Sequence, residues 1–133
     1  MTHQTLLPPG WPRPSGYANG MAAQGRLVVT GGLIGWDAAG QIVSNTFAGQ
    51  LRQLLENTLA VLHEADAGPE HVVRMTWYIV DRAEYQRDLA EIGRVYREVM
   101  GRHFPAMAVV QVAGLMEAGA KVEIETTAVV PVA

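Results

Sequence analysis

The sequence predicts an α/β (α+β) domain in which one mixed β-sheet of about six strands carries two helices on one face. Three observations support this prediction. The chain has 133 residues, a length that suits one domain, residues 1–133, around one hydrophobic core. Short β-branched segments alternate with two longer segments whose apolar residues recur at helical spacing. Each helical segment lies between two strands, and a strand–helix–strand crossover implies parallel pairing somewhere in the sheet.

The first third of the chain is expected to be extended. Residues 1–14 are rich in proline, which opposes regular helix and limits strand pairing, so we expect an extended segment there. Residues 26–33 are β-branched and apolar, which predicts a strand. We expect this strand to pair with residues 17–22 through a turn at Gln24 and Gly25. A further short strand is expected near residues 41–43.

Two amphipathic helices are predicted. The first spans about residues 47–65, and Ser44, Asn45 or Thr46 is suited to cap it. The second begins after Asp81, with Glu84 completing a capping box, and Gly101 suits the position after its end. Its apolar stripe consists of Tyr85, Leu89, Ile92, Tyr96 and Val99.

Three more strands are expected. Residues 72–80 are rich in β-branched and aromatic side chains, and residues 106–115 are nearly continuously apolar, as in a strand buried on both faces. Residues 121–130 alternate, which places Glu123 and Glu125 on the same face. Since two helices cover one face, the opposite face needs a cover, and a second subunit is the simplest candidate.

Composition excludes several classes of function. The net charge is -3, and the nine arginines and Lys121 form no basic stripe, so we expect no nucleic-acid partner. The chain has no cysteine, and its four histidines lack metal-binding spacing, so we expect no metal site. No apolar run approaches the roughly 20 residues that span a bilayer, so we expect a cytoplasmic protein without membrane contact.

A few residues are candidates for a small-molecule site. Glu123 and Glu125 either form a solvated sheet face or place a carboxylate in an interface cleft, where it orients a water molecule or moves a proton. Tyr17, Trp36 and Trp77 are candidates to line an apolar pocket. Trp36 lies beside a turn, which suits a rim position, whereas packing is the simpler role for Trp77.

The chain from about Ser15 to Val130 resembles the Rid family (RidA/YjgF, formerly labelled endoribonuclease L-PSP). The resemblance implies a chorismate-mutase-like fold that assembles as a homotrimer with three clefts between subunits. The order and spacing of six segments carry the resemblance: Gly16–Gly20, Leu27–Ile34, Gln53–Asn57, Val73–Tyr78, Phe104–Ala106 and Val122–Glu125.

The resemblance also implies a chemistry and a set of site positions. Archetypal members hydrolyse 2-imino acids to 2-keto acids and ammonia without a cofactor. The matching positions that keep the family residue are Tyr17 and Glu123. An arginine that directly follows the Pro-Ala pair grips the substrate carboxylate, and here that position is Met107. The family's serine, asparagine and cysteine fall at Gly31, about Gly93 and Val109.

The departures from the family pattern point to an altered substrate. An arginine–carboxylate pair is bidentate and charge-assisted, and methionine supplies neither property. Met107, Val109 and Gly31 predict a roomier, more apolar cleft for a larger, less anionic ligand such as an aromatic imine or enamine. The first hypothesis is therefore a cofactor-free imine or enamine deaminase, and the second is a non-catalytic metabolite-binding or sensing trimer. A ribonuclease, the third hypothesis, is disfavoured by the acidic net charge.

Overall fold

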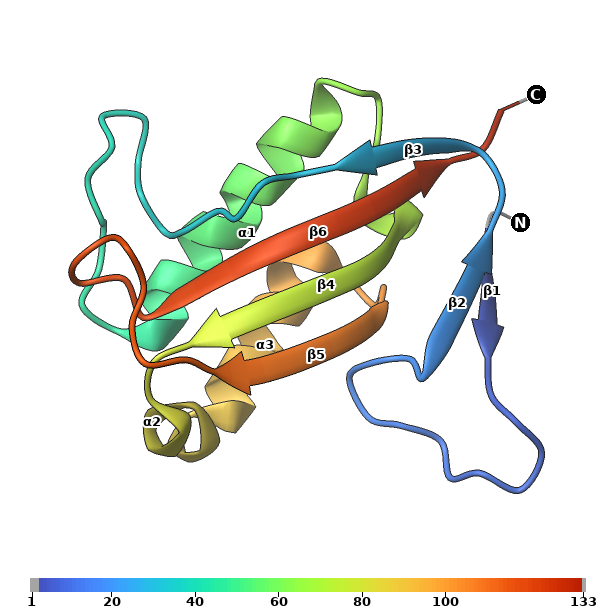
Figure 1. Ribbon diagram of the computed structural model, residues 1–133, viewed down its shortest axis with the longest axis horizontal. Helices are drawn as coiled ribbons and strands as arrows, with labels where there is room; N and C mark the ends of the chain where they lie inside the picture. Colours follow the sequence, from blue (N-terminus) through green and yellow to red (C-terminus); the bar gives the residue numbers. More distant parts are fainter. Residues whose placement is uncertain (1–2, 133) are drawn as a thin grey trace.

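The computed structural model describes residues 3–132 and contains six strands, three α-helices and a short 3-10 helix (Figure 1). Their bounds are β1 His3–Leu6, β2 Gly20–Ala23, β3 Arg26–Val29, α1 Phe47–His63, η1 Pro69–His71, β4 Val72–Ile79, α2 Arg82–Arg87, α3 Leu89–Met100, β5 Ala106–Gln111 and β6 Val122–Val130.

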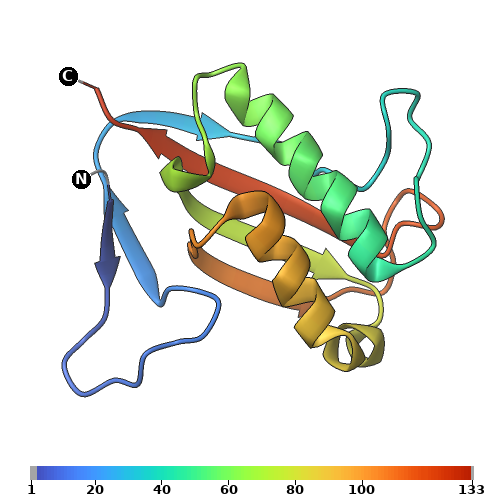
Figure 2. The ribbon, with the colours of Figure 1, turned by 180° about the vertical axis from the view of Figure 1, so that it is seen from behind.

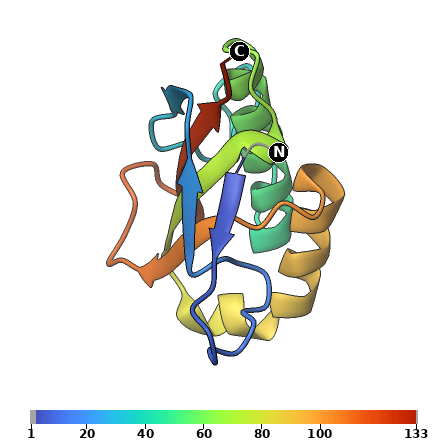
Figure 3. The same cartoon turned by 90° about the vertical axis from the view of Figure 1, so that its right-hand side faces the viewer.

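The main sheet has four strands in the order β3-β6-β4-β5. β4 and β5 are parallel, as the crossover between them predicted, and β6 is antiparallel to both β3 and β4. All three α-helices lie on one face of this sheet and leave its other face open (Figures 2 and 3). The α+β class and the one-sided cover are therefore confirmed.

The six observed strands form two sheets, which corrects the expectation of one, and β1 lies in the proline-rich segment for which no strand was expected. β2 pairs with β1 rather than with β3, and β3 pairs with β6. At Gly25 the backbone passes so close to Val130 that a Cβ there would collide with the Val130 carbonyl oxygen. Because of this contact, the chain that leaves β2 continues as β3 along the edge of β6 and does not form a tight hairpin with β2. β1 also ends before Pro8, so its residues keep the N–H groups that pairing needs.

Three further elements differ from expectation. The second predicted helix is divided into α2 and α3 at Asp88, whose carboxylate bonds Arg87 at 3.0 Å and whose backbone leaves helical geometry. Residues 41–43 form no strand and contribute a single bridge, between Ile42 and Trp36. β5 ends at Gln111 and is a partly exposed edge strand, because within the described chain only β4 pairs along it.

The core lies between the main sheet and the helices. Leu51, Leu54 and Leu55 of α1 are fully buried against it, as their spacing predicted. Thr46, one of the three candidate caps, accepts a hydrogen bond from the Gly49 N–H at 3.1 Å. The alternation of β6 turns Ile124 into this core, which leaves Glu123 and Glu125 on the open face.

Candidate functional site

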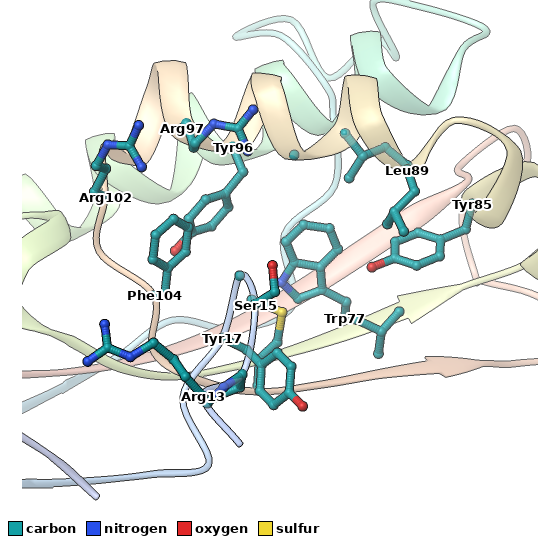
Figure 4. Close-up of a pocket in the computed structure, with 16 residues that line it drawn as sticks. Arg13, Ser15, Tyr17, Trp77, Tyr85, Leu89, Tyr96, Arg97, Arg102 and Phe104 are labelled. Carbon is teal, nitrogen blue, oxygen red and sulfur yellow. The ribbon is translucent and has the colours of Figure 1, made fainter. Parts of the chain in front are cut away.

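A pocket of about 990 Å³ lies between α2 and α3 on one side and β4, β5 and the segment around residues 13–17 on the other (Figure 4). Three of the predicted site residues line it, namely Tyr17, Met107 and Val109. Gly93, at the position matched to the family's asparagine, lines it as well. The other three predicted site residues, Gly31, Trp36 and Glu123, do not.

Strand register determines how the pocket floor is built. Met107 lies opposite Met75 and Val109 opposite Trp77 in the parallel β4–β5 pair. Met75 and Trp77 are buried on the helix side of the sheet, so Met107 and Val109 point to that side too. Both side chains therefore form the floor of the pocket, on the sheet side, across from α3.

Tyr17 is held beside the start of β5. The Ala18 N–H donates to the Pro105 carbonyl at 2.9 Å, and Ala18 also bridges to Ala106. These contacts place the exposed Tyr17 ring at the pocket edge, with Ser15 beside it (Figure 4).

Aromatic side chains form a wall of the pocket. Tyr96 stacks on Phe104 with 5.7 Å between ring centroids, and Trp77 is tilted against Tyr96 at 6.3 Å. Burial raises the pKa of Tyr96, and its hydroxyl donates to the His103 carbonyl, so the phenol stays neutral and fixes the turn after α3. Burial also raises the pKa of Tyr85 at the other end of the pocket. The wall suits a flat, apolar ligand.

Three arginines also line the pocket: Arg13, Arg97 and Arg102. Arg74, by contrast, is an exposed β4 residue outside this pocket. Arg97 and Arg102 were not anticipated. The available signal was the four-residue spacing of Gly93 and Arg97, which puts both on one helix face.

Glu123 belongs to a second cluster, on the open face of the sheet. A Cβ at Gly32 would collide with its carboxylate, so the bare glycine lets the carboxylate lie against the backbone that follows Gly31. On the same face the Tyr78 hydroxyl donates to Oε1 of Glu125 at 2.6 Å, and this hydrogen bond raises the pKa of Tyr78. Trp36 lies near the tip of the neighbouring loop, where its carbonyl accepts from Asn57 at 2.8 Å.

The described residues contain no group of three or more acidic or histidine side chains that would hold a metal ion. No helix among residues 3–132 is both long and apolar enough to cross a membrane. The site therefore consists of an aromatic and arginine-lined pocket on one face of the sheet and a carboxylate cluster on the other.

Comparison with known proteins identifies relatives along most of the chain. The family described as Endoribonuclease L-PSP matches residues 12–130. A 2-iminobutanoate/2-iminopropanoate deaminase of Homo sapiens is 32% identical over 105 residues, which cover 78% of this chain and 73% of that protein. A RutC family protein of Pyrococcus abyssi is 30% identical over 116 residues, covering 86% of this chain and 88% of that protein.

Solved structures show the same fold. YyfB of Yersinia pestis, a Rid family protein of unknown function, superposes with a TM-score of 0.86 at 28% identity and covers 98% of this chain and 100% of that one. RidA from a Psychrobacter species superposes with a TM-score of 0.69 at 27% identity, covering 96% of this chain and 99% of that one.

Proposed function

This chain belongs to the endoribonuclease L-PSP family, also called the Rid or YjgF family, and on that premise we propose that it hydrolyses an imine or enamine to a carbonyl compound and ammonia. The substrate is larger than the archetypal 2-imino acids and carries an aromatic ring. The reaction takes place in a cleft between subunits of a homotrimer.

One observation carries this proposal. Tyr17, Met107 and Val109, which the resemblance matched to family site positions, line one pocket although they are far apart in the sequence. The pocket adds Trp77 and Phe104 as aromatic walls. A site of this kind suits a small organic molecule better than a macromolecule.

The position of Glu123 supports the location between subunits. Glu123 lies on the face of the sheet that this chain's helices do not cover, away from the pocket. The same face presents Leu27 and Val29 at 66% and 61% exposure, an apolar surface that a second copy would bury. In a closed ring, Glu123 of one subunit faces the pocket of the next.

The chemistry requires little from the protein. Water adds to the carbon of the C=N bond, and the resulting carbinolamine loses ammonia to leave C=O, with no oxidation or reduction. Glu123 orients the water, accepts its proton and passes that proton to the departing nitrogen, while the Tyr17 hydroxyl bonds the substrate. Positioning and proton transfer together account for the catalysis proposed here.

The substitutions in the pocket support a larger substrate. Met107 and Val109 are apolar and stand at the positions where the family has a charged and a reactive side chain. Methionine also adapts its shape to irregular ligands. Space and apolar surface therefore increase at the positions where a compact imino acid would be gripped.

The test measures ammonia release from imines that an amino acid oxidase generates in place, with small aliphatic and aromatic members. We expect the native protein to accelerate the aromatic imines and Met107→Arg to shift its preference toward small imino acids. Glu123→Ala should abolish the acceleration, whereas Glu125→Ala, two residues along the same strand face, should retain most of it. A native protein inactive on the whole panel would refute the proposal.

The second candidate is a non-catalytic metabolite-binding trimer. It is favoured by the loss of the arginine, serine, asparagine and cysteine at four matched positions. A binder raises the melting temperature in the presence of its ligand without releasing ammonia, and an enzyme does both. Thermal denaturation with the keto-acid products of the same panel separates the two.

A further inference from the structure

We propose that Arg97, together with Arg102 and Arg13 in the lining of the same pocket, forms an anion site that replaces the arginine missing at position 107. The ligand is then an aromatic carboxylate, with its charge at the α3 side of the pocket and its ring against the aromatic wall. This inference rests on the proposed function in that it assigns the substrate class to the same pocket. It also revises the expectation of a less anionic ligand.

The first argument is the relation between Arg97 and Gly93. A Cβ at Gly93 would lie 3.2 Å from Nη1 of Arg97, so the guanidinium lies directly over the bare glycine. Both residues line the pocket from the same face of α3. Loss of the side chain at position 93 thus leaves the space that the guanidinium occupies.

The second argument is that the pocket arginines lack carboxylate partners. Among residues 3–132, Arg13, Arg97 and Arg102 form no ion pair. Arg94, one turn away on α3, pairs with both Glu91 and Glu98. The same helix therefore carries Arg94, which two carboxylates neutralise, and Arg97, which lines the pocket without an ion pair. Figure 4 shows Arg97 on α3 above the pocket.

The third argument comes from the Trp77 indole. Trp77 is 3% exposed, and its Nε1–H has no hydrogen-bond partner within the described chain. A buried donor without a partner is unfavourable, and Trp77 lines the pocket. A ligand oxygen in the pocket satisfies this donor, and neither an aliphatic tail nor a bare ring does.

Together these features define the ligand's shape. The positive charge comes from α3, the turn after it and Arg13, whereas the apolar surface comes from Phe104, Met107 and Val109. A ligand whose carboxylate binds Arg97 therefore needs an apolar group, such as an aromatic ring, to reach the floor of the pocket. Small imino acids have the carboxylate but lack such a group.

Binding is tested by titration calorimetry with benzoylformate, a stable aromatic 2-keto acid, and with its methyl ester and pyruvate. We expect benzoylformate to bind at least about tenfold more tightly than either. Arg97→Gln should weaken benzoylformate about ten- to a hundredfold, the cost of a charge-assisted bond, and leave the ester unchanged. Arg94→Gln removes the same charge from the same helix and should change nothing.

A second variant guards against misfolding as an explanation. Gly93→Asn places a side chain where the Arg97 guanidinium lies, and a helix interior favours asparagine over glycine, so the fold should be at least as stable. Benzoylformate binding should nevertheless weaken. The inference is overturned if benzoylformate fails to bind, if acid and ester bind equally, or if Arg97→Gln behaves like Arg94→Gln.

The outcomes separate this inference from the proposed function. Binding that depends on Arg97, without ammonia release from any imine, supports the anion site and refutes the deaminase. Turnover of aromatic imines that Arg97→Gln does not impair supports the deaminase and refutes the anion site.

Discussion

Met107 and Glu123 lie on opposite faces of the same sheet. Met107 is in register with Met75 and shares its helix-side orientation, whereas Glu123 is in register with Tyr78 on the open face. The two side chains cannot reach one substrate within a single chain. If both contact one substrate, as we propose, the cleft must combine the pocket of one subunit with the carboxylate of another.

Subunit complementation tests this arrangement. Tyr17→Ala damages the pocket half of the cleft and Glu123→Ala damages the carboxylate half, so each variant alone should be inactive. In trimers formed randomly from equal amounts of both, about a quarter of the clefts regain two native halves. Ammonia release should therefore recover to about a quarter of the native rate after co-expression.

The control for complementation carries both substitutions on one chain. Mixing that chain with either single variant restores no complete cleft, so activity should stay at background. Recovery in this control, or no recovery from the two single variants, would contradict a cleft shared between subunits.

Gln50 fixes the loop that leads into β6, and its replacement should be costly. Its amide donates to the carbonyls of Ser44 and Gly119 at 2.9 Å each and accepts from the Lys121 N–H at 2.8 Å. The side chain is 1% exposed. Gln50→Leu leaves these backbone groups without hydrogen-bond partners. We expect it to lower the free energy of unfolding by roughly 2–4 kcal/mol. Urea denaturation measures this, with the exposed Gln86→Leu as a near-neutral control.

Core packing under α1 gives a second stability prediction. Leu51 is fully buried between α1 and the sheet, so Leu51→Ala should cost about 2–5 kcal/mol of unfolding free energy. Val61→Ala, on the same helix at 42% exposure, should cost about 0.5 kcal/mol or less. Equal urea midpoints for the two variants would contradict this account of the core.

Much of the fold could be predicted because strong local patterns determine it. The spacing of Leu51, Leu54 and Leu55 placed α1, and the alternation around Ile124 placed Glu123 and Glu125 on one face. The pairing of β2 with β1 was missed because prolines in residues 1–14 argued against a strand there, and because the contact of Gly25 with Val130 joins positions more than 100 residues apart. Periodicity carries no information about such contacts.

The candidate site was predictable only in part. Tyr17, Met107 and Val109 were found through family positions, and the structure brings them together. Arg97 was missed because a charged, exposed residue on an amphipathic helix is usually a surface residue, and sequence does not show that its guanidinium lies over Gly93 at the pocket. The missing hydrogen-bond partner of the Trp77 Nε1–H likewise cannot be predicted from sequence, because it depends on the positions of all neighbouring acceptors in the fold.

Acid should weaken the contact between α1 and α3 through Glu98. Arg52 of α1 and Arg94 of α3 both bond the Glu98 carboxylate, and these bonds lower its pKa below the ordinary value of 4.5. A depressed carboxyl pKa stabilises the folded state above the unfolded pKa, and this contribution is lost as the pH falls through the folded value. The native protein should therefore be more stable than Glu98→Gln above about pH 5, and the difference should vanish in stronger acid.

Urea midpoints of both proteins between pH 7 and 3 measure this difference in stability. The control is Glu91→Gln, which removes only the more distant carboxylate partner of Arg94. A gap between native protein and Glu98→Gln that persists unchanged at the lowest pH would show that packing, and not charge, links residue 98 to α1.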